Sequence, residues 1–313
     1  MGVRTISQAT FLLARPANKK PIMPTLRQLH REQQPLISPL AHDALSARVI
    51  ERAGFKTFNI GGSSLLAARH ALPDLGLAGF GEMAAGIRDI VEACRIPCLV
   101  DGDDGYGDVK SVTRMVRTYE SMGVSGLLLE DQARETKQPG AASARNVIPL
   151  DIMEQKLRAA LEARSNSEFV IIGRTDALAR EGLDGAIRRA ERFLKLGADG
   201  VFVAGLKTEQ QYERVGAAFK GHWNAAALFQ SAQTPWISPQ ILHAMGFSQV
   251  CYPNLLIGRI AKALQQGLER LTSLANGNTG AFENSDSEMA VDVLNEAIGL
   301  NRWNEIESRF QTV

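Results

Sequence analysis

The sequence has few cysteines: three in 313 residues, at positions 94, 98 and 251. Cys94 and Cys98 are the only closely spaced pair, and no second pair of ligands accompanies them, so a structural zinc site is excluded. The cysteines are odd in number and lie in or beside apolar segments, which argues against a disulfide framework. We expect three buried free thiols in a protein of a reducing compartment.

The sequence also lacks an excess of charge and a long apolar run. Its formal net charge is +1, which argues against a surface that binds nucleic acid. A membrane-spanning helix needs about 20 apolar residues, and no such run is present. With 45% hydrophobic and 22% charged residues, the composition is that of a soluble globular protein. Small-molecule chemistry is therefore favoured, without a nucleic-acid or membrane partner.

Acidic residues are absent from the first 31 positions, which contain Arg4, Arg15, Lys19, Lys20, Arg27 and Arg31. A basic segment without acids is typical of organelle transit peptides. We favour the other interpretation, in which residues 1–25 are an N-terminal extension of a cytoplasmic protein.

Short apolar runs alternate with segments in which apolar residues return every three or four positions. The runs predict strands at residues 36–37, 57–60, 98–100, 126–129, 169–172, 200–203, 225–228 and 249–252. Helical spacing is clearest at residues 111–122, 151–163, 183–196 and 255–271. Eight such units predict an α/β fold, a closed (β/α)8 TIM barrel over residues 26–274, with a doubly wound open sheet as the alternative. Glycines at positions 54, 123, 197 and 246 are expected to end helices in the left-handed conformation.

The last part of the chain, residues 275–313, has a different character. A segment rich in Gly, Asn and Ser, from Ala275 to Ser287, reads as a linker. Apolar periodicity then predicts helices at residues 289–300 and 303–310. We expect these C-terminal helices to pack on a neighbouring subunit.

Acidic residues follow the predicted strands. Asp101 and Asp103, in the stretch VDGDDGYGDV, come after the third strand, and Glu130 comes after the fourth. Because the strand ends of a barrel meet at one mouth, these side chains should converge there with Asp74. Such a cluster fits a hard cation, Mg2+ or Mn2+, that keeps several waters. The alternative is that Asp101 and Asp103 cap a solvated loop and the helix that starts near residue 108.

A second feature is the stretch NIGGSSLL after the second strand. Gly61, Gly62 and Ser63 can present backbone N–H groups to an anion. Arg174, after the fifth strand, is expected opposite them and is the one cation well placed to complete a carboxylate clamp. An ordinary turn is the alternative interpretation of the glycines.

Several phrases together resemble the isocitrate lyase/phosphoenolpyruvate mutase superfamily. They are VDGDDGYGD, LLLEDQ, HALPDLGL and VIIGRTDALAREGLDGAIRRAERFLKLGADGVF, and the similarity spans about residues 26–310. The short methylisocitrate lyase-like and oxaloacetate decarboxylase-like branches are the most similar. The resemblance implies a barrel whose eighth helix is swapped between subunits, usually in a dimer of dimers, which is a homotetramer.

The resemblance also implies roles for the residues at the mouth. Mg2+ would be held by Asp101 directly, and by Asp74, Asp103 and Glu130 largely through water. The substrate is a 2-oxo or 2-hydroxy acid whose carboxylate would rest on residues 61–63. Arg174 would face the oxyanion of an enolate intermediate.

The sequence departs from the lyases in the other half of the site. In the gating loop ETKQPGAASARNVIP, Lys137 and Gly140 persist, but Pro139 stands in place of the catalytic cysteine and Ala141 in place of histidine. Arg145 replaces a loop lysine. Further differences from the lyases are Asn59, Ala204 and Gln230. Proline cannot transfer a proton, so a standard isocitrate or methylisocitrate lyase is disfavoured.

Decarboxylation needs less help with proton transfer, because it yields the enolate directly. The sequence therefore predicts a lyase that breaks a C–C bond in a small dicarboxylate, most like an oxaloacetate decarboxylase, although Asn254 stands where that branch has a histidine near the substrate. One alternative is a lyase of a methylisocitrate- or dimethylmalate-like hydroxy acid, in which Lys137 or Arg145 acts. Phosphonopyruvate-type P–C chemistry and a non-catalytic 2-oxo acid binding protein are the others.

Overall fold

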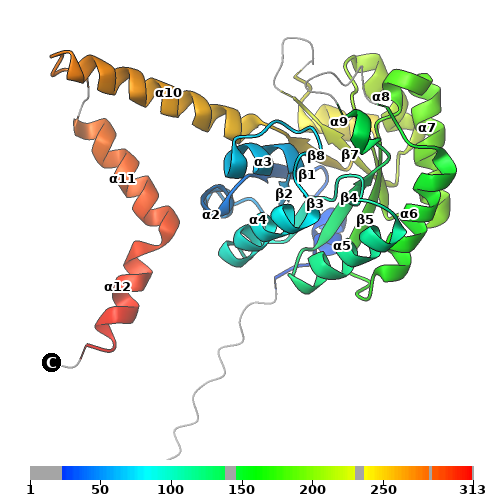
Figure 1. Cartoon of the computed structure of the whole chain (residues 1–313), viewed down its shortest axis with the longest axis horizontal. Coiled ribbons are helices and arrows are strands. Elements are labelled where there is room, and N and C mark those ends of the chain that lie inside the picture. Colours follow the sequence, from blue (N-terminus) through cyan, green and yellow to red (C-terminus); the bar gives the residue numbers. More distant parts are fainter. Residues whose placement is uncertain (1–22, 138–145, 230–235, 282–283, 312–313) are drawn as a thin grey trace, which may run out of the picture.

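A closed parallel barrel of eight strands, in the order β1 to β8, forms the body of this computed structural model (Figure 1). The structure describes residues 23–137, 146–229, 236–281 and 284–311. The predicted TIM barrel is confirmed, and the open-sheet alternative is wrong because β1 pairs with β8 and leaves no sheet edge.

The strands are β1 (Leu36–Ala41), β2 (Phe58–Ile60), β3 (Cys98–Asp101), β4 (Gly126–Glu130), β5 (Val170–Thr175), β6 (Gly200–Val203), β7 (Trp223–Ala227) and β8 (Gln249–Tyr252). The helices of the barrel are α1 (Leu26–Glu32), α2 (Ala44–Arg52), α3 (Gly62–His70), α4 (Phe80–Ala93), α5 (Val109–Ser121), α6 (Leu150–Ala163), α7 (Leu178–Leu196), α8 (Glu209–Ala218) and α9 (Pro239–Met245). A short 3-10 helix, η1 (Arg134–Thr136), follows β4. The chain ends in α10 (Leu255–Ala275), α11 (Asn284–Ile298) and α12 (Leu300–Ser308).

Alternate residues of each strand belong to different parts of the core. Leu99 and Leu128 lie in a cluster made of strand residues together with Leu26 and Leu29 of α1. Val100 instead packs in the larger cluster with the surrounding helices. The strands are thus buried on both faces, which is why they read as unbroken apolar runs. Helix α1 closes the end of the barrel where the strands begin, and the strand ends that carry the acids face the other way.

Glycines end helices where the sequence predicts. Gly54, Gly123, Gly197 and Gly246 all have positive φ, between 87° and 119°. Several predicted helix boundaries differ. Helix α7 begins at residue 178 and contains a break at Gly182 (φ 69°), whereas the sequence predicts a helix from residue 183. Helix α11 also begins earlier than expected, at Asn284, so the predicted linker is shorter.

The C-terminal helices extend away from the barrel (Figure 1). Helix α10 leaves from β8 and has no buried residue, and Leu264, Leu268 and Leu271 on it are more than half exposed. Helix α11 returns to contact α2, where Arg52 pairs with Glu296. The exposed leucines agree with the expected packing on another subunit, but the helix swap stays a prediction. Within the described residues, no helix is both long and apolar enough to cross a membrane.

Candidate functional site at the mouth of the barrel

The predicted site residues come together where β3, β4 and β5 end. Glu130, the last residue of β4, lies in register with Arg174 on β5. Asp101 is the last residue of β3, and its neighbour in register is on β4. Because these strands are parallel and adjacent, their polar ends share one small volume. The predicted convergence of Asp101, Glu130 and Arg174 is therefore seen in the structure.

Arg174 is the central cation of this cluster. Its Nη1 lies 2.9 Å from Oε2 of Glu130 and 3.4 Å from Oδ2 of Asp101. Its Nη2 donates a hydrogen bond of 3.1 Å to Oδ1 of Asp176, and its guanidinium lies over the ring of Phe202. Contacts on several sides fix the plane of the guanidinium. Such a fixed fork suits recognition of a carboxylate or an oxyanion.

Lys137 is a second cation at the mouth. Its Nζ lies 2.6 Å from Oδ1 of Asp103, 2.9 Å from Oδ1 of Asp74 and 3.6 Å from Oε1 of Glu130. Lys137, which the sequence also singles out as a candidate catalytic residue, thus lies with Arg174 among the acids. The sequence placed Lys137 on a loop beyond the strand ends. In the structure its long side chain reaches back into the acidic cluster.

A third cation, Arg134, was not singled out by the sequence. Its Nη2 lies 2.7 Å from Oδ1 of Asp104 and 3.4 Å from Oδ2 of Asp103. Lys156 of α6 also approaches Asp104, and it donates a hydrogen bond of 2.8 Å to the carbonyl oxygen of that residue. The spacing of Arg134 from the EDQ phrase gave no signal of this role, because the role depends on how the chain turns after β4.

The loop after β3 has an unusual backbone. Asp103 and Tyr106 have φ values of 53° and 59°, a region that non-glycine residues seldom adopt. Gly105, with φ 82°, lies so close to α5 that an added Cβ would be 2.3 Å from Cγ2 of Val112. Asp101 accepts a hydrogen bond of 3.1 Å from the backbone N–H of Asp103. Strain of this kind is found where a loop must present side chains in a fixed way.

The alternative that Asp101 and Asp103 only cap a loop and a helix does not hold for Asp103, because another aspartate caps α5. Asp108 caps α5 by accepting hydrogen bonds from the backbone N–H groups of Lys110 and Ser111. Asp103 does not cap a helix; it is nearly buried and faces Lys137. The two kinds of aspartate in this stretch thus have different roles.

Burial and neighbouring charges shift the pKa values of the acids in different directions. Burial raises the pKa of Asp101 and raises that of Glu130 well above its ordinary value, in spite of Arg174. Burial also opposes ionisation of Asp103, but the ammonium of Lys137 and the guanidinium of Arg134 outweigh it, so the pKa of Asp103 is lowered. Additional positive charge near Asp101 and Glu130 would therefore be favourable.

The four carboxylates at the mouth are the kind of side chain that binds a divalent cation. Asp74, Asp101, Asp103 and Glu130 supply only carboxylate oxygens, the ligands that Mg2+ and Mn2+ prefer. Within the described residues, however, no three Asp, Glu, His or Cys side chains already meet closely enough to hold a metal ion. Lys137 lies against three of the four carboxylates, so direct contact of a metal with Asp103 and Glu130 requires its ammonium to move aside.

The glycines after β2 begin a helix. Gly61 is the N-cap of α3, so the backbone N–H groups of Gly62 and Ser63 lie in its first turn, where they have no partner within the helix. A Cβ at Gly62 would lie 3.6 Å from Oδ2 of Asp101. The segment is therefore more than an ordinary turn: it places the positive end of a helix beside the acids.

The structure describes three of the other positions that the sequence singled out. Asn254 is exposed, has φ 60° and caps α10 without a side-chain hydrogen bond; no contact joins it to the acids among the described residues. Asn59 is buried and accepts a hydrogen bond of 3.3 Å from Gln249, and Ala204 is buried after β6. Arg145, Pro139, Gly140, Ala141 and Gln230 lie outside the described residues.

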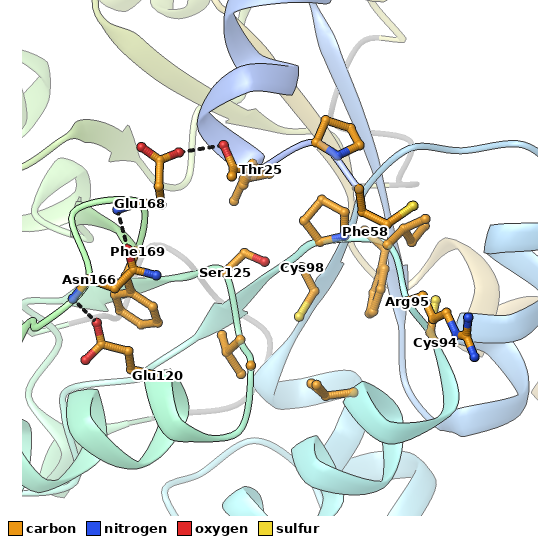
Figure 2. Close-up of a pocket in the computed structure, with 18 residues that line it drawn as sticks. Thr25, Phe58, Cys94, Arg95, Cys98, Glu120, Ser125, Asn166, Glu168 and Phe169 are labelled. Carbon is orange, nitrogen blue, oxygen red and sulfur yellow. Dashed lines mark hydrogen bonds between the residues drawn. The ribbon is translucent and has the colours of Figure 1, made fainter. Parts of the chain in front are cut away.

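The opposite end of the barrel holds a cavity of about 270 Å3 (Figure 2). It is lined by Thr25 before α1, by Cys98 at the start of β3 and by Glu168 and Phe169 before β5. Figure 2 shows Thr25 donating its hydroxyl hydrogen bond to Glu168 on the wall. None of the acids of the mouth lines this cavity, so it is separate from the candidate site. All three cysteines are buried and free, as predicted.

Comparisons with known proteins agree with this geometry. The sequence profile of a family described as phosphoenolpyruvate phosphomutase matches residues 26–272. The chain belongs to the isocitrate lyase/phosphoenolpyruvate mutase superfamily. It is 32% identical to 2,3-dimethylmalate lyase from Eubacterium barkeri over 287 residues, 92% of this chain and 97% of that one. The predicted resemblance is confirmed, and the chain is an enzyme of a superfamily of lyases.

Solved structures of relatives contain small ligands. Oxaloacetate acetylhydrolase in complex with its product oxalate superposes with a TM-score of 0.77 at 28% identity, over 88% of this chain and 92% of that one. Phosphonopyruvate hydrolase, solved with oxalate and Mg2+, has a TM-score of 0.73 at 24% identity, over 88% of this chain and 94% of that one. Small acids of this kind are thus ligands of relatives.

Proposed function

We propose that this enzyme cleaves a C–C bond in a small 2-oxo or 2-hydroxy dicarboxylate, with Mg2+ or Mn2+ at the acidic cluster. One observation carries the proposal: Arg174, fixed by ion pairs, lies against the buried Glu130 and the partly buried Asp101, and the pKa values of both acids are raised. A site that combines acids with a fixed arginine can accept a divalent cation on the acids together with an anionic substrate on the arginine.

Each residue would have a defined task. The N–H groups of Gly62 and Ser63 would bind one substrate carboxylate at the start of α3. Asp101 would hold the divalent ion, with Asp74, Asp103 and Glu130 around it. When bound, the ion would supply Lewis-acid stabilisation of negative charge on the substrate oxygen. Arg174 would neutralise the same oxyanion from its fixed position, and a preorganised charge of this kind is worth several kcal/mol.

Among the reactions open to such a site, we favour decarboxylation of a 2-oxo diacid such as oxaloacetate. Pro139 stands in place of the cysteine of the lyases, and loss of CO2 produces the enolate without a base. Water can then protonate the enolate carbon. Lys137 would remain to balance the carboxylates or to meet the distal carboxylate of the substrate.

A second candidate has support from similarity. The match to 2,3-dimethylmalate lyase spans nearly the whole of both chains. In that reaction class a 2-hydroxy diacid is split into two carboxylic acids, and a group on the enzyme must take the hydroxyl proton. Lys137 at the mouth, or Arg145 outside the described residues, would have to serve as the acid or base.

Proton NMR of substrate mixtures tests the proposal. The purified enzyme with Mg2+ is incubated separately with oxaloacetate, 2,3-dimethylmalate, 2-methylisocitrate and phosphonopyruvate, each beside an enzyme-free control. Formation of pyruvate from oxaloacetate alone, stopped by EDTA, supports the decarboxylase. Two organic acids from a hydroxy diacid support the second candidate.

Two further outcomes would contradict the proposal. Turnover of phosphonopyruvate alone would place the enzyme among those that break P–C bonds. No turnover of any substrate, together with a rise in Tm on adding oxalate and Mg2+, would instead indicate a binding protein that has lost catalysis.

A further inference from the structure

Arg134 touches two loops that are far apart in the sequence. On one side its Nε donates a hydrogen bond of 2.8 Å to Oδ1 of Asp104, and its Nη2 lies 3.4 Å from Oδ2 of Asp103. On the other side its Nη1 donates to the carbonyl oxygens of Gly76 and Ala78, at 3.2 and 3.4 Å. One guanidinium thus spans the loop after β3 and the segment at residues 71–79.

The second of these segments carries a predicted metal ligand. Asp74 precedes Gly76 by two residues, and its carboxylate meets Lys137 at the mouth. Residues 71–79 belong to no helix or strand, so hydrogen bonds from other parts of the chain must fix the position of this segment. The contacts from Arg134 to two of its carbonyl oxygens are such bonds.

The chain shows local features that make this contact possible. Gly76 has φ 72°, and a Cβ there would lie 3.0 Å from Cγ of Arg134, so glycine lets the arginine approach. The guanidinium also lies over the ring of Tyr106, 5.1 Å from its centre. A lysine cannot reproduce the arrangement, because a single ammonium cannot direct separate N–H groups at opposite sides.

We propose that Arg134 is a positioning residue that holds the Asp74 segment against the Asp103 loop, so that their carboxylates face one point. In this role the side chain needs no contact with the substrate. It acts through the two loops, as hydrogen-bonded partners of metal ligands do in other enzymes. Its effect on metal affinity rests on the proposed function, whereas its effect on the loops does not.

The test compares Arg134→Gln and Arg134→Lys with the wild-type protein. Arg192→Gln is the matched control, since Arg192 forms an ion pair of 2.8 Å with Glu154 on the outside of the barrel. Hydrogen–deuterium exchange of peptides that cover residues 71–79 is measured without metal. Mn2+ affinity is then measured by electron paramagnetic resonance, and Tm and circular dichroism verify that each variant is folded.

We expect Arg134→Gln to speed exchange at residues 71–79 and to weaken Mn2+ binding by about tenfold or more. Arg134→Lys keeps a positive charge beside Asp104 but cannot bond both carbonyl oxygens, so it should show the same fast exchange at residues 71–79 and the same weak Mn2+ binding. The control should match the wild type in both measurements. Weak Mn2+ binding by a lysine variant with the Tm of the wild type separates a positioning role from a loss of charge or of stability.

Unchanged exchange at residues 71–79, or unchanged Mn2+ affinity in a folded Arg134→Gln variant, would overturn the proposal. If that variant does not fold, the lysine variant decides in the same way: faster exchange supports the role and wild-type behaviour refutes it. If the wild-type protein binds no Mn2+, the metal in the proposed function is wrong, and the exchange data alone decide the role of Arg134.

Discussion

The ammonium of Lys137 lies 2.6 Å from Oδ1 of Asp103, closer than the 2.9 Å between Arg174 and Glu130. Burial of the lysine would lower its pKa, but the carboxylates of Glu130, Asp103 and Asp74 outweigh this and raise it. Lys137 therefore stays charged at any physiological pH. It balances acids that a divalent ion would otherwise balance, and a metal ion bound at these acids would be repelled by the ammonium of Lys137.

Replacing Lys137 should change metal affinity in a definite direction. In Lys137→Gln the competing ammonium is gone, so we expect Mn2+ to bind several-fold tighter at pH 8, a gain on the order of 1 kcal/mol. Lys110→Gln is the control, because Lys110 pairs with Asp108 at an exposed position. Titration calorimetry measures both. Weaker Mn2+ binding by Lys137→Gln alone would show instead that the ammonium supports the metal-bound arrangement.

The strained loop after β3 gives a stability prediction. Gly105 has φ 82° and no room for a Cβ beside Val112, whereas Gly54 has φ 88° and nothing within 4 Å. Gly54→Ala should cost about 1–2 kcal/mol for the left-handed backbone alone. Gly105→Ala adds overpacking and should cost about 1–3 kcal/mol more. Urea unfolding compares them, and equal losses would contradict the close approach.

A pH prediction concerns His30 at the closed end of the barrel. Its ring stacks on Trp223 at 3.8 Å, and its Nε2 lies 2.7 Å from the Ser248 hydroxyl. Burial, with Arg27 and Arg31 nearby, lowers the pKa of His30 to about 4. Below about pH 6.5 the unfolded chain takes up this proton and the folded protein does not, so the free energy of unfolding falls from pH 6.5 to 4.

The variant His30→Gln isolates this contribution. Urea unfolding at pH 7.5 and 4.5 should show that the wild-type protein loses about 1–2 kcal/mol more than the variant, a value reduced for the partial exposure of the ring. The same dependence on pH in both proteins would mean that His30 is protonated as easily in the folded state as in the unfolded chain.

The sequence predicts the barrel well because its strands are buried on both faces. Runs such as Gly126–Leu129 are too short for helices, and the acids that follow them mark where the strands end. The meeting of Asp101, Glu130 and Arg174 follows from parallel strands alone. These parts of the site depend only on strand ends, so the local pattern was enough to find them.

The remaining cations depend on the path of the chain between strands, which no periodicity encodes. Arg134 begins the short helix η1 after β4 and Lys137 directly follows that helix. Their partners at residues 74–78 and 103–104 come from two other loops. A long side chain can reach any of several acids from such a segment. The sequence places Asn254 correctly after β8, where it is exposed at the start of α10, and its contact with a substrate stays a prediction.

Dependence of turnover on Mg2+ in Asp101→Asn tests the central claim most directly. Asp101 is the residue expected to contact the ion, and asparagine keeps its size while removing its charge. With the fastest substrate found by NMR, the wild-type rate should vanish in EDTA and return on titration with Mg2+. Asp101→Asn should be slower by about 10³-fold at saturating Mg2+. Full activity of the wild-type protein in EDTA, or of Asp101→Asn with Mg2+, would contradict the account.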